Sequence, residues 1–326
     1  MLIDTFNRKH DYLRISLTDA CNLRCTYCMP EDDYAFLPSS KTMKEEEIFR
    51  IAEVFVSLGV TKIRLTGGEP LVRKDAPEII RRLSTLPVTL SLTTNATRLH
   101  TCMDAIRDAG IKAINISLDT LDRNRFQLLT KRDEFERVRA NIELLLQQDI
   151  QPKINMVVMK GVNDQEIPDF IRWTSEQPVH IRFIEFMPFS GNHWDKEKVL
   201  TWRDIVSIVE QHHSIVPLGR GQNETASQYQ IPGHKGTFAV ISTMSAPFCG
   251  DCNRIRLTAD GKLKNCLFSA SETDILTPFR NGADIIPLIT ETIRLKKKEL
   301  GGQFTAELDQ VEASHIQNRS MISIGG

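Results

Sequence analysis

The feature that most constrains this chain is a group of three closely spaced cysteines near its start, Cys21, Cys25 and Cys28. Three residues separate the first pair, two separate the second, and Tyr27 directly precedes the last cysteine. Iron–sulfur clusters are bound by cysteine thiolates, normally four per cluster, so three on one short loop predict a 4Fe–4S cluster with one open iron. A zinc site or a set of buried thiols is the alternative, but structural zinc sites usually use four ligands in two spaced pairs.

This spacing, with an aromatic residue before the third cysteine, resembles the signature of the radical S-adenosylmethionine (radical SAM) enzymes. The resemblance implies that the open iron chelates the amino and carboxylate groups of SAM. It also implies that an electron from the cluster cleaves SAM to a 5′-deoxyadenosyl radical. Tyr27 is then expected at the cofactor site.

Six short strand-like runs alternate with helical stretches in the first 186 residues, which predicts βα units around a parallel sheet. Polar residues alternate with apolar ones along the first five of these runs, so one face of the sheet is polar and the other packs under helices. A solvent-exposed sheet face in an α+β protein is the alternative. We predict an α/β fold, an incomplete six-unit (βα) TIM-like barrel whose polar interior holds a ligand. The runs are 13–18, 62–66, 88–93, 113–118, 153–158 and 181–186.

The pattern changes after residue 191, where short strands and helices follow a polar stretch. This predicts two regions, a barrel core at 1–191 and a C-terminal α+β extension at 192–326 that closes the open side of the barrel. The extension is expected to contain helices at 202–213, 271–280 and 285–300, and strands at 228–231, 237–243 and 254–259.

A second cysteine trio lies in this extension, formed by Cys249, Cys252 and Cys266. Asp260-Gly261 between them is a strong hairpin-turn signal. Pairing outward from the turn sets Ala259 opposite Lys262 and Cys266 opposite Ile255, close to Cys252, so a second 4Fe–4S cluster with an open iron is predicted. The isolated Cys102 lies in a helical stretch and is interpreted as an ordinary semi-buried thiol.

Two trios narrow the resemblance to the GTP 3′,8-cyclase family of molybdenum cofactor biosynthesis, over almost the whole chain. The segments that carry it are 18–30, 66–71, 248–256 and 325–326. The resemblance implies a radical SAM lyase that removes a ribose 3′ hydrogen from GTP and joins C3′ to C8, giving 3′,8-cyclo-7,8-dihydro-GTP. A peptide-modifying radical SAM enzyme with an auxiliary cluster is the alternative. A zinc-containing RNA-binding module is disfavoured by the formal net charge of −1.

The resemblance also implies which residues bind the two small molecules. Gly68, in a glycine pair that lets a ligand approach the backbone, is expected at the SAM amino group, with Ser117 and Met187 lining SAM. The open iron of the second cluster is expected to bind the purine of GTP. No P-loop motif is present, so side chains must hold the phosphates. The residues expected to bind GTP are Arg14, Lys62, Arg64, Thr93, Lys153, Arg254, Ile255 and Arg256.

The last two residues, Gly325 and Gly326, are expected in the active site. They have no side chain, so they can enter a gap too narrow for a Cβ. In the family that the chain resembles, this tail reaches into the pocket and is needed after SAM cleavage.

The start of the sequence has no signal-peptide pattern, and no run of eighteen apolar residues occurs, so a cytoplasmic location with reduced thiols is expected. The expected partners are GTP, an electron donor of the flavodoxin or ferredoxin type and the next enzyme of the pathway. No nucleic acid or membrane partner is expected, and the resemblance implies a homodimer.

Overall fold

One twelve-stranded sheet organises the whole chain in the computed structural model, which describes residues 1–29, 34–305 and 307–325. The strand order across the sheet is β12-β11-β10-β1-β2-β3-β4-β5-β6-β9-β8-β7. The strands are β1 (Tyr12–Ser16), β2 (Lys62–Thr66), β3 (Thr89–Thr94), β4 (Ala113–Ser117), β5 (Gln151–Val158), β6 (His180–Glu185), β7 (Val216–Gly219), β8 (Ser227–Gln230), β9 (Thr237–Ile241), β10 (Arg254–Leu257), β11 (Lys262–Lys264) and β12 (Thr273–Asp274).

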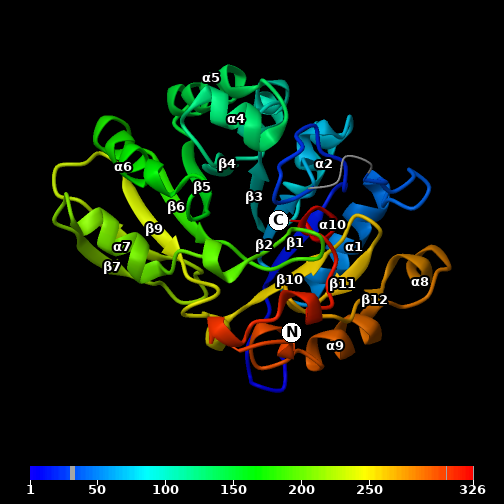
Figure 1. Ribbon diagram of the computed structural model, residues 1–326. Coiled ribbons are helices and arrows are strands. Elements are labelled where there is room, and N and C mark those ends of the chain that lie inside the picture. The colour runs from blue at the N-terminus through cyan, green and yellow to red at the C-terminus, as the bar shows by residue number, and fades with distance from the viewer. Residues whose placement is uncertain (30–33, 306, 326) are drawn as a thin grey trace.

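Helices α1 to α6 lie on the outside of this curved sheet, whereas α10 lies inside the curve, as Figure 1 shows. Helix α1 begins with three acidic residues, Glu45, Glu46 and Glu47. Negative charge at this end stabilises a helix by interacting with its dipole. The α-helices are α1 (Glu45–Ser57), α2 (Ala76–Leu83), α3 (Met103–Asp108), α4 (Arg123–Thr130), α5 (Phe135–Gln147), α6 (Ile167–Glu176), α7 (Trp202–Glu210), α8 (Leu276–Arg280), α9 (Ile286–Arg294) and α10 (Met321–Ile324).

The six strand-like runs of the sequence are the six strands β1 to β6, which neighbour one another in chain order and pair in parallel. Each lies within two residues of its expected bounds. The alternation of side chains is also confirmed, because Ile15, Ile63 and Ile154 are fully buried on the apolar face. Polar neighbours such as Asn115 and Asn155 line a cavity on the other face.

The C-terminal strands extend both edges of this parallel core. β10 pairs in parallel with β1, and β9 pairs in parallel with β6. The antiparallel strands β11, β12, β8 and β7 follow outward. The edges of the core would otherwise present unpaired backbone groups, which these strands satisfy. The division into regions 1–191 and 192–326 stays a prediction.

All three expected C-terminal helices are shorter than the sequence suggested, and the one expected at 202–213 ends at Glu210. The stretch 271–280 is helical only from Leu276, because Thr273 and Asp274 pair with Leu263 and Lys262 as strand β12. Sheet pairing therefore overrides the helical pattern there. The helix expected at 285–300 ends at Arg294 and is followed by a non-helical turn.

The register expected for the C-terminal hairpin was wrong by one residue. Arg256 lies opposite Lys264, and the amide of Thr258 donates to the carbonyl of Lys262 at 2.9 Å. The turn has three residues rather than two, with Gly261 at φ 69°. A three-residue hairpin commonly places glycine in this left-handed position. Ala259 is therefore not paired with Lys262.

Within the described ranges, no helix is both long and apolar enough to cross a membrane.

Candidate active site

A cavity of about 310 Å³ lies on the polar face of the sheet, and both cysteine trios line it. It therefore brings together residues from the start, middle and end of the chain. The expected site residues on its wall are Arg14, Cys21, Cys25, Tyr27, Cys28, Gly68, Thr93, Ser117, Met187, Cys249, Cys252, Arg254, Arg256 and Cys266.

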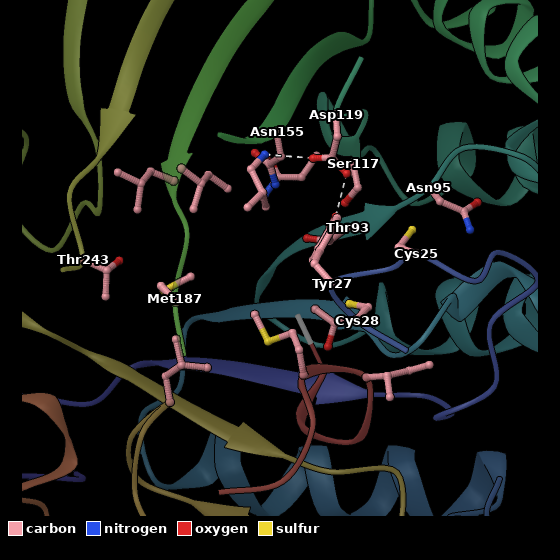
Figure 2. Close-up of a pocket in the computed structure, with 18 of the residues that line it drawn as sticks. Cys25, Tyr27, Cys28, Thr93, Asn95, Ser117, Asp119, Asn155, Met187 and Thr243 are labelled. Atoms are coloured by element: carbon pink, nitrogen blue, oxygen red, sulfur yellow. Dashed lines mark hydrogen bonds between the residues drawn. The ribbon is translucent and has the colours of Figure 1, made fainter. Parts of the chain in front are cut away.

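The first trio lies on a loop that is fastened to the end of α4. The amides of Arg24 and Thr26 donate to the carbonyls of Thr130 and Leu129 at 2.8 and 2.9 Å. Figure 2 shows Cys25 and Cys28 on one side of the cavity, with Met187 and Thr243 on the other. The loop thus presents its thiols to the cavity.

The environment of the first trio disfavours free thiolates. Burial, followed by the charge of Glu69, raises the pKa of Cys21 to about 11, and burial with the charge of Cys21 raises that of Cys28 to about 12. Burial raises the pKa of Cys25 well above its usual value, with the neighbouring Cys28 adding to the effect. Three thiolates so placed need a cationic group between them.

The cysteines of each trio lie close enough to influence one another at the cavity. In the part of the chain that the structure describes, no three His, Cys, Asp or Glu side chains lie close enough to bind one metal ion. The three cysteines of each trio nonetheless interact electrostatically and line one cavity. Thiols that converge in this way are what a 4Fe–4S cluster requires, since each thiolate binds a separate iron.

Tyr27 is held by a buried carboxylate. Its hydroxyl donates to Asp119 Oδ2 at 2.7 Å, and the Val157 amide donates to Asp119 Oδ1 at 2.8 Å. Burial raises the pKa of Asp119 to about 6. The ring of Tyr27 is therefore fixed beside Cys28 at the cavity wall (Figure 2).

The glycine pair after β2 allows two loops to approach closely. A Cβ on Gly68 would lie 2.4 Å from the Asp19 carbonyl oxygen, so only glycine fits against the segment before the first cysteine. The next residue, Glu69, is fully buried and accepts from Thr94 Oγ1 at 2.7 Å and the Asn95 amide at 2.6 Å. Burial raises its pKa to about 7.

The second trio differs from the first at Cys252, which has cationic neighbours. Burial raises the pKa of Cys249. Burial would also raise that of Cys252, but the charges of Lys296 and then Arg254 outweigh it and lower the pKa to about 6. Cys266 faces the same cavity although the hairpin register differs from the expected one.

A cationic wall, defined here as Arg14, Arg182, Arg254 and Arg256, adjoins the second trio. Burial and the charge of Arg254 lower the pKa of Arg256 to about 10, and burial and Arg64 lower that of Arg182 to about 9. Arg182 Nε and Nη2 and Arg254 Nη2 are buried and have no hydrogen-bond partner among the described residues. Buried guanidinium groups that repel one another form a site for a multiply charged anion.

Four of the expected GTP residues do not line this cavity. Arg64 donates to Thr93 Oγ1 at 3.3 Å and also bonds the Tyr12 hydroxyl, while Lys62 lies 4.7 Å from the Tyr12 ring centroid. Burial, and then the charge of Arg182, lower the pKa of Lys153. The Ile255 side chain is fully buried in the apolar core, so only its backbone could contact a nucleotide.

The C-terminal tail reaches the strand ends beside the cavity. Arg256 Nη1 donates to the Gly325 carbonyl at 2.5 Å. Gly325 has φ 84°, and a Cβ there would lie 2.6 Å from Thr66 Oγ1. Arg319 fastens the tail to Asp260 at 3.0 and 2.9 Å. Gly326 lies outside the described residues.

Arg182 and Asp119 are among the polar residues of the cavity that were not expected from the sequence. Arg182 alternates with Ile181 and Phe183 along β6, so extending the polar-face pattern to the sixth strand would have found it. Asp119 follows the end of β4, a position where parallel sheets usually carry functional side chains. Cys102 does not line the cavity and is buried in the core.

A parallel core with a cysteine loop flanked by buried carboxylates is typical of one class of protein, and comparison with known families agrees. Residues 15–174 match the model of the radical SAM superfamily, and residues 179–301 match the family described as Molybdenum Cofactor Synthesis C. The chain belongs to the radical SAM superfamily.

Curated relatives identify the branch of that superfamily. GTP 3′,8-cyclase of Listeria monocytogenes is 40% identical over 334 residues, which cover 100% of this chain and 99% of that protein. The mitochondrial GTP 3′,8-cyclase of Arabidopsis thaliana is 42% identical, covering 100% of this chain and 84% of that protein. Within the superfamily, this chain is a member of the GTP 3′,8-cyclase family.

Some relatives are much longer than this chain. Molybdenum cofactor biosynthesis protein 1 of Drosophila melanogaster is 44% identical over 305 residues, but these cover 91% of this chain and 54% of that protein. The chain thus spans about half the length of such relatives.

Solved structures share the fold. Streptococcus suis SuiB bound to S-adenosylmethionine has a TM-score of 0.62 and 15% identity, covering 97% of this chain and 77% of that one. SuiB bound to its precursor peptide SuiA has a TM-score of 0.63, also at 15% identity. At this identity the likeness concerns the fold alone.

Proposed function

We propose that the chain converts GTP to 3′,8-cyclo-7,8-dihydro-GTP, an early step of molybdenum cofactor biosynthesis. The cationic wall beside the second cysteine trio is the observation that carries this proposal. It supplies clustered, desolvated guanidinium groups where an anionic nucleotide would lie between the two trios. Family membership and the names of the two full-length relatives support the same activity.

The first trio would hold a 4Fe–4S cluster through Cys21, Cys25 and Cys28, and the second trio another through Cys249, Cys252 and Cys266. When bound, the first cluster and SAM together supply a hydrogen-abstracting radical. The residues of this chain position that chemistry. Tyr27, Gly68, Ser117 and Met187 would contact SAM, and the Tyr27–Asp119 hydrogen bond keeps the ring fixed.

The nucleotide would lie with its phosphates against the cationic wall and its base toward the second trio. Arginine forks suit phosphate oxygens because they donate two parallel hydrogen bonds. The buried, unpartnered nitrogens of Arg182 and Arg254 supply such donors. Thr93, whose hydroxyl accepts from Arg64, would contact the base or ribose. Lys62, Arg64 and Lys153 would contribute their charge from behind the wall.

A cavity that encloses two small molecules also needs closed sides. We propose that β1 to β6 form an incomplete TIM-like barrel, region 1–191, and that region 192–326 closes its open side. Gly325 and Gly326 would complete the pocket at the strand ends. A flavodoxin or ferredoxin-type electron donor, a homodimer and a cytoplasmic location remain proposals. The Arabidopsis relative is named as mitochondrial.

The test is a product assay on anaerobically reconstituted protein with GTP, SAM and a chemical reductant. We expect 5′-deoxyadenosine and 3′,8-cyclo-7,8-dihydro-GTP in equal amounts, measured by liquid chromatography and mass spectrometry. A peptide-modifying enzyme would leave GTP intact and form 5′-deoxyadenosine independently of it. Cleavage of SAM without any GTP-derived product would therefore contradict the proposal.

A further inference from the structure

A buried lysine contacts one of the cysteines of the second trio. Lys296 lies in the turn after α9 and is 3% exposed. Its Nζ donates to Cys252 Sγ at 3.4 Å and to the Arg254 carbonyl at 3.0 Å. The ammonium group therefore points at the proposed cluster ligand from behind the cavity wall.

No carboxylate neutralises this ammonium group in the described ranges, where Lys296 forms no ion pair with Asp or Glu. The nearby carboxylate of Asp4 pairs with other groups instead. Its Oδ2 lies 2.6 Å from Arg8 Nε and 3.0 Å from His10 Nε2. A buried cation is costly unless an anion compensates it. The Cys252 sulfur is the group in contact that can carry a negative charge.

The contact is held by buried structure on both sides. Arg8 Nη1 donates to the Cys249 carbonyl at 2.8 Å and the Lys298 carbonyl at 2.6 Å, and its Nη2 donates to the Lys297 carbonyl at 2.8 Å. One guanidinium thus ties the cysteine loop to the turn that carries Lys296. Asp4 fixes Arg8 in turn, through its own buried carboxylate.

In the described ranges, no ammonium group donates to a thiol of the first trio. Burial raises the pKa of Cys21 and Cys25, and the carboxylates Glu69 and Asp119 add to this, while the charge of Arg24 opposes it at Cys21. A side-chain donor to a thiol there is the neutral amide of Asn95, 3.8 Å from Cys21 Sγ. The two sites therefore differ by an ammonium group at one of the ligands.

We propose that Lys296 is a positioning residue of the second cluster, which donates an N–H···S hydrogen bond to the Cys252 ligand and raises the reduction potential of that cluster. This inference rests on the second cluster of the proposed function. Reduction adds negative charge to a cluster, and hydrogen bonds or positive charge at the sulfurs stabilise that state.

The experiment measures the potential of the second cluster alone. The chain carrying Cys21→Ala, Cys25→Ala and Cys28→Ala is reconstituted anaerobically, and its remaining cluster is titrated with electron paramagnetic resonance as the readout. Lys296→Met, Lys296→Gln and Lys297→Met are compared in that background. Lys297 is the matched control, because it is the adjacent lysine, has the same charge and is exposed.

We expect Lys296→Met to shift the redox equilibrium at least tenfold toward the oxidised form. For a one-electron couple this lowers the reduction potential by about 59 mV. Lys296→Gln, which keeps a donor without the charge, should fall between, and Lys297→Met should match the parent. Equal potentials in the Lys296→Met and Lys297→Met proteins would overturn the inference. A parent without any cluster would instead overturn the two-cluster part of the proposed function.

Cluster loss in Lys296→Met is also informative when the variant is made in the otherwise unmodified chain. Loss of about four of eight irons with SAM cleavage retained would support the inference, because only the second site is affected. Loss of all iron together with SAM cleavage would overturn it, since Lys296 would then support the whole fold rather than the second site.

Discussion

Arg64, Arg14 and Arg256 occupy one register across β2, β1 and β10, so neighbouring Cα atoms are about one strand spacing, ~4.8 Å, apart. Burial lowers the pKa of Arg14 well below its usual value, and the charge of Arg256 adds to this. Such a row is unfavourable without an anion, and a polyphosphate binding there would relieve the repulsion.

Removing one arginine of the cationic wall should weaken GTP binding selectively. We expect Arg182→Ala and Arg256→Ala each to reduce GTP affinity tens-fold or more, since losing one partner of a desolvated charge contact costs about 2 to 5 kcal/mol. SAM affinity should be unchanged in both. Isothermal titration calorimetry measures the two ligands separately, and Arg294→Ala on the exposed face of α9 is the control. Unchanged GTP affinity in both wall variants would place the nucleotide elsewhere.

Tyr12 should make GTP binding depend on pH. Burial raises the pKa of Tyr12, but Arg64, Arg14 and Lys62 outweigh it and lower the pKa to about 7. Below pH 7 the phenol is neutral and adds no negative charge beside these cations, whereas above pH 7 a phenolate offsets one of them. GTP affinity relative to Tyr12→Phe should therefore fall severalfold between pH 6 and pH 8.5. A parallel pH dependence in the two proteins, measured by equilibrium dialysis, would contradict this.

For single elements, hydrophobic periodicity predicts where a strand lies in the sequence and which of its faces is buried. The six core strands were predicted within two residues because leucines and isoleucines alternate with polar residues along each. The same pattern, read only for its first five strands, missed Arg182. Local turn chemistry was less reliable. Asp260-Gly261 signals a hairpin, but whether its turn has two or three residues depends on the register in which β10 pairs with β11.

Pairing partners far apart in sequence were beyond prediction from local patterns. Nothing in residues 254–257 indicates that they lie beside β1, and nothing in Thr273 and Asp274 indicates an edge strand. The contact of Lys296 with Cys252 likewise depends on how the turn after α9 packs. The cysteines were predictable because their spacing within a loop carries the chemistry.

The C-terminal tail should contribute to the pocket through its shape, because its two glycines carry no reactive side chain. Changing Gly325 and Gly326 to Ala should leave iron content and 5′-deoxyadenosine formation near normal but abolish the cyclised product. A Cβ on Gly325 would clash with Thr66 Oγ1 and Ser16 Cβ, at 2.6 and 2.9 Å. Chromatography of both products from one reaction is the measurement. A variant that still cyclises GTP at the normal rate would refute this role.

For the whole molecule, we expect the two cysteine trios to have different roles, the first in SAM cleavage and the second in forming the product. The intact chain should bind about eight iron and eight sulfide after anaerobic reconstitution. Changing Cys21, Cys25 and Cys28 to Ala should halve the iron and abolish SAM cleavage. Changing Cys249, Cys252 and Cys266 to Ala should also halve the iron but leave some SAM cleavage without product. Iron and sulfide analysis with the product assay tests this, and equal loss of SAM cleavage would contradict it.

The pairing of β10 with β1 has a consequence for how the chain is made. Asp11 and Asn253, whose side chains are 2.7 Å apart at this junction, are 242 residues apart in sequence. At roughly 5 to 20 residues per second, the ribosome needs about ten seconds or more to deliver the missing neighbour of β1. Throughout that interval a growing chain carries a strand edge open to pairing with other nascent chains. The fold must therefore be protected during synthesis as well as suited to catalysis. Either a chaperone or rapid burial of the β1 edge must prevent pairing between nascent chains.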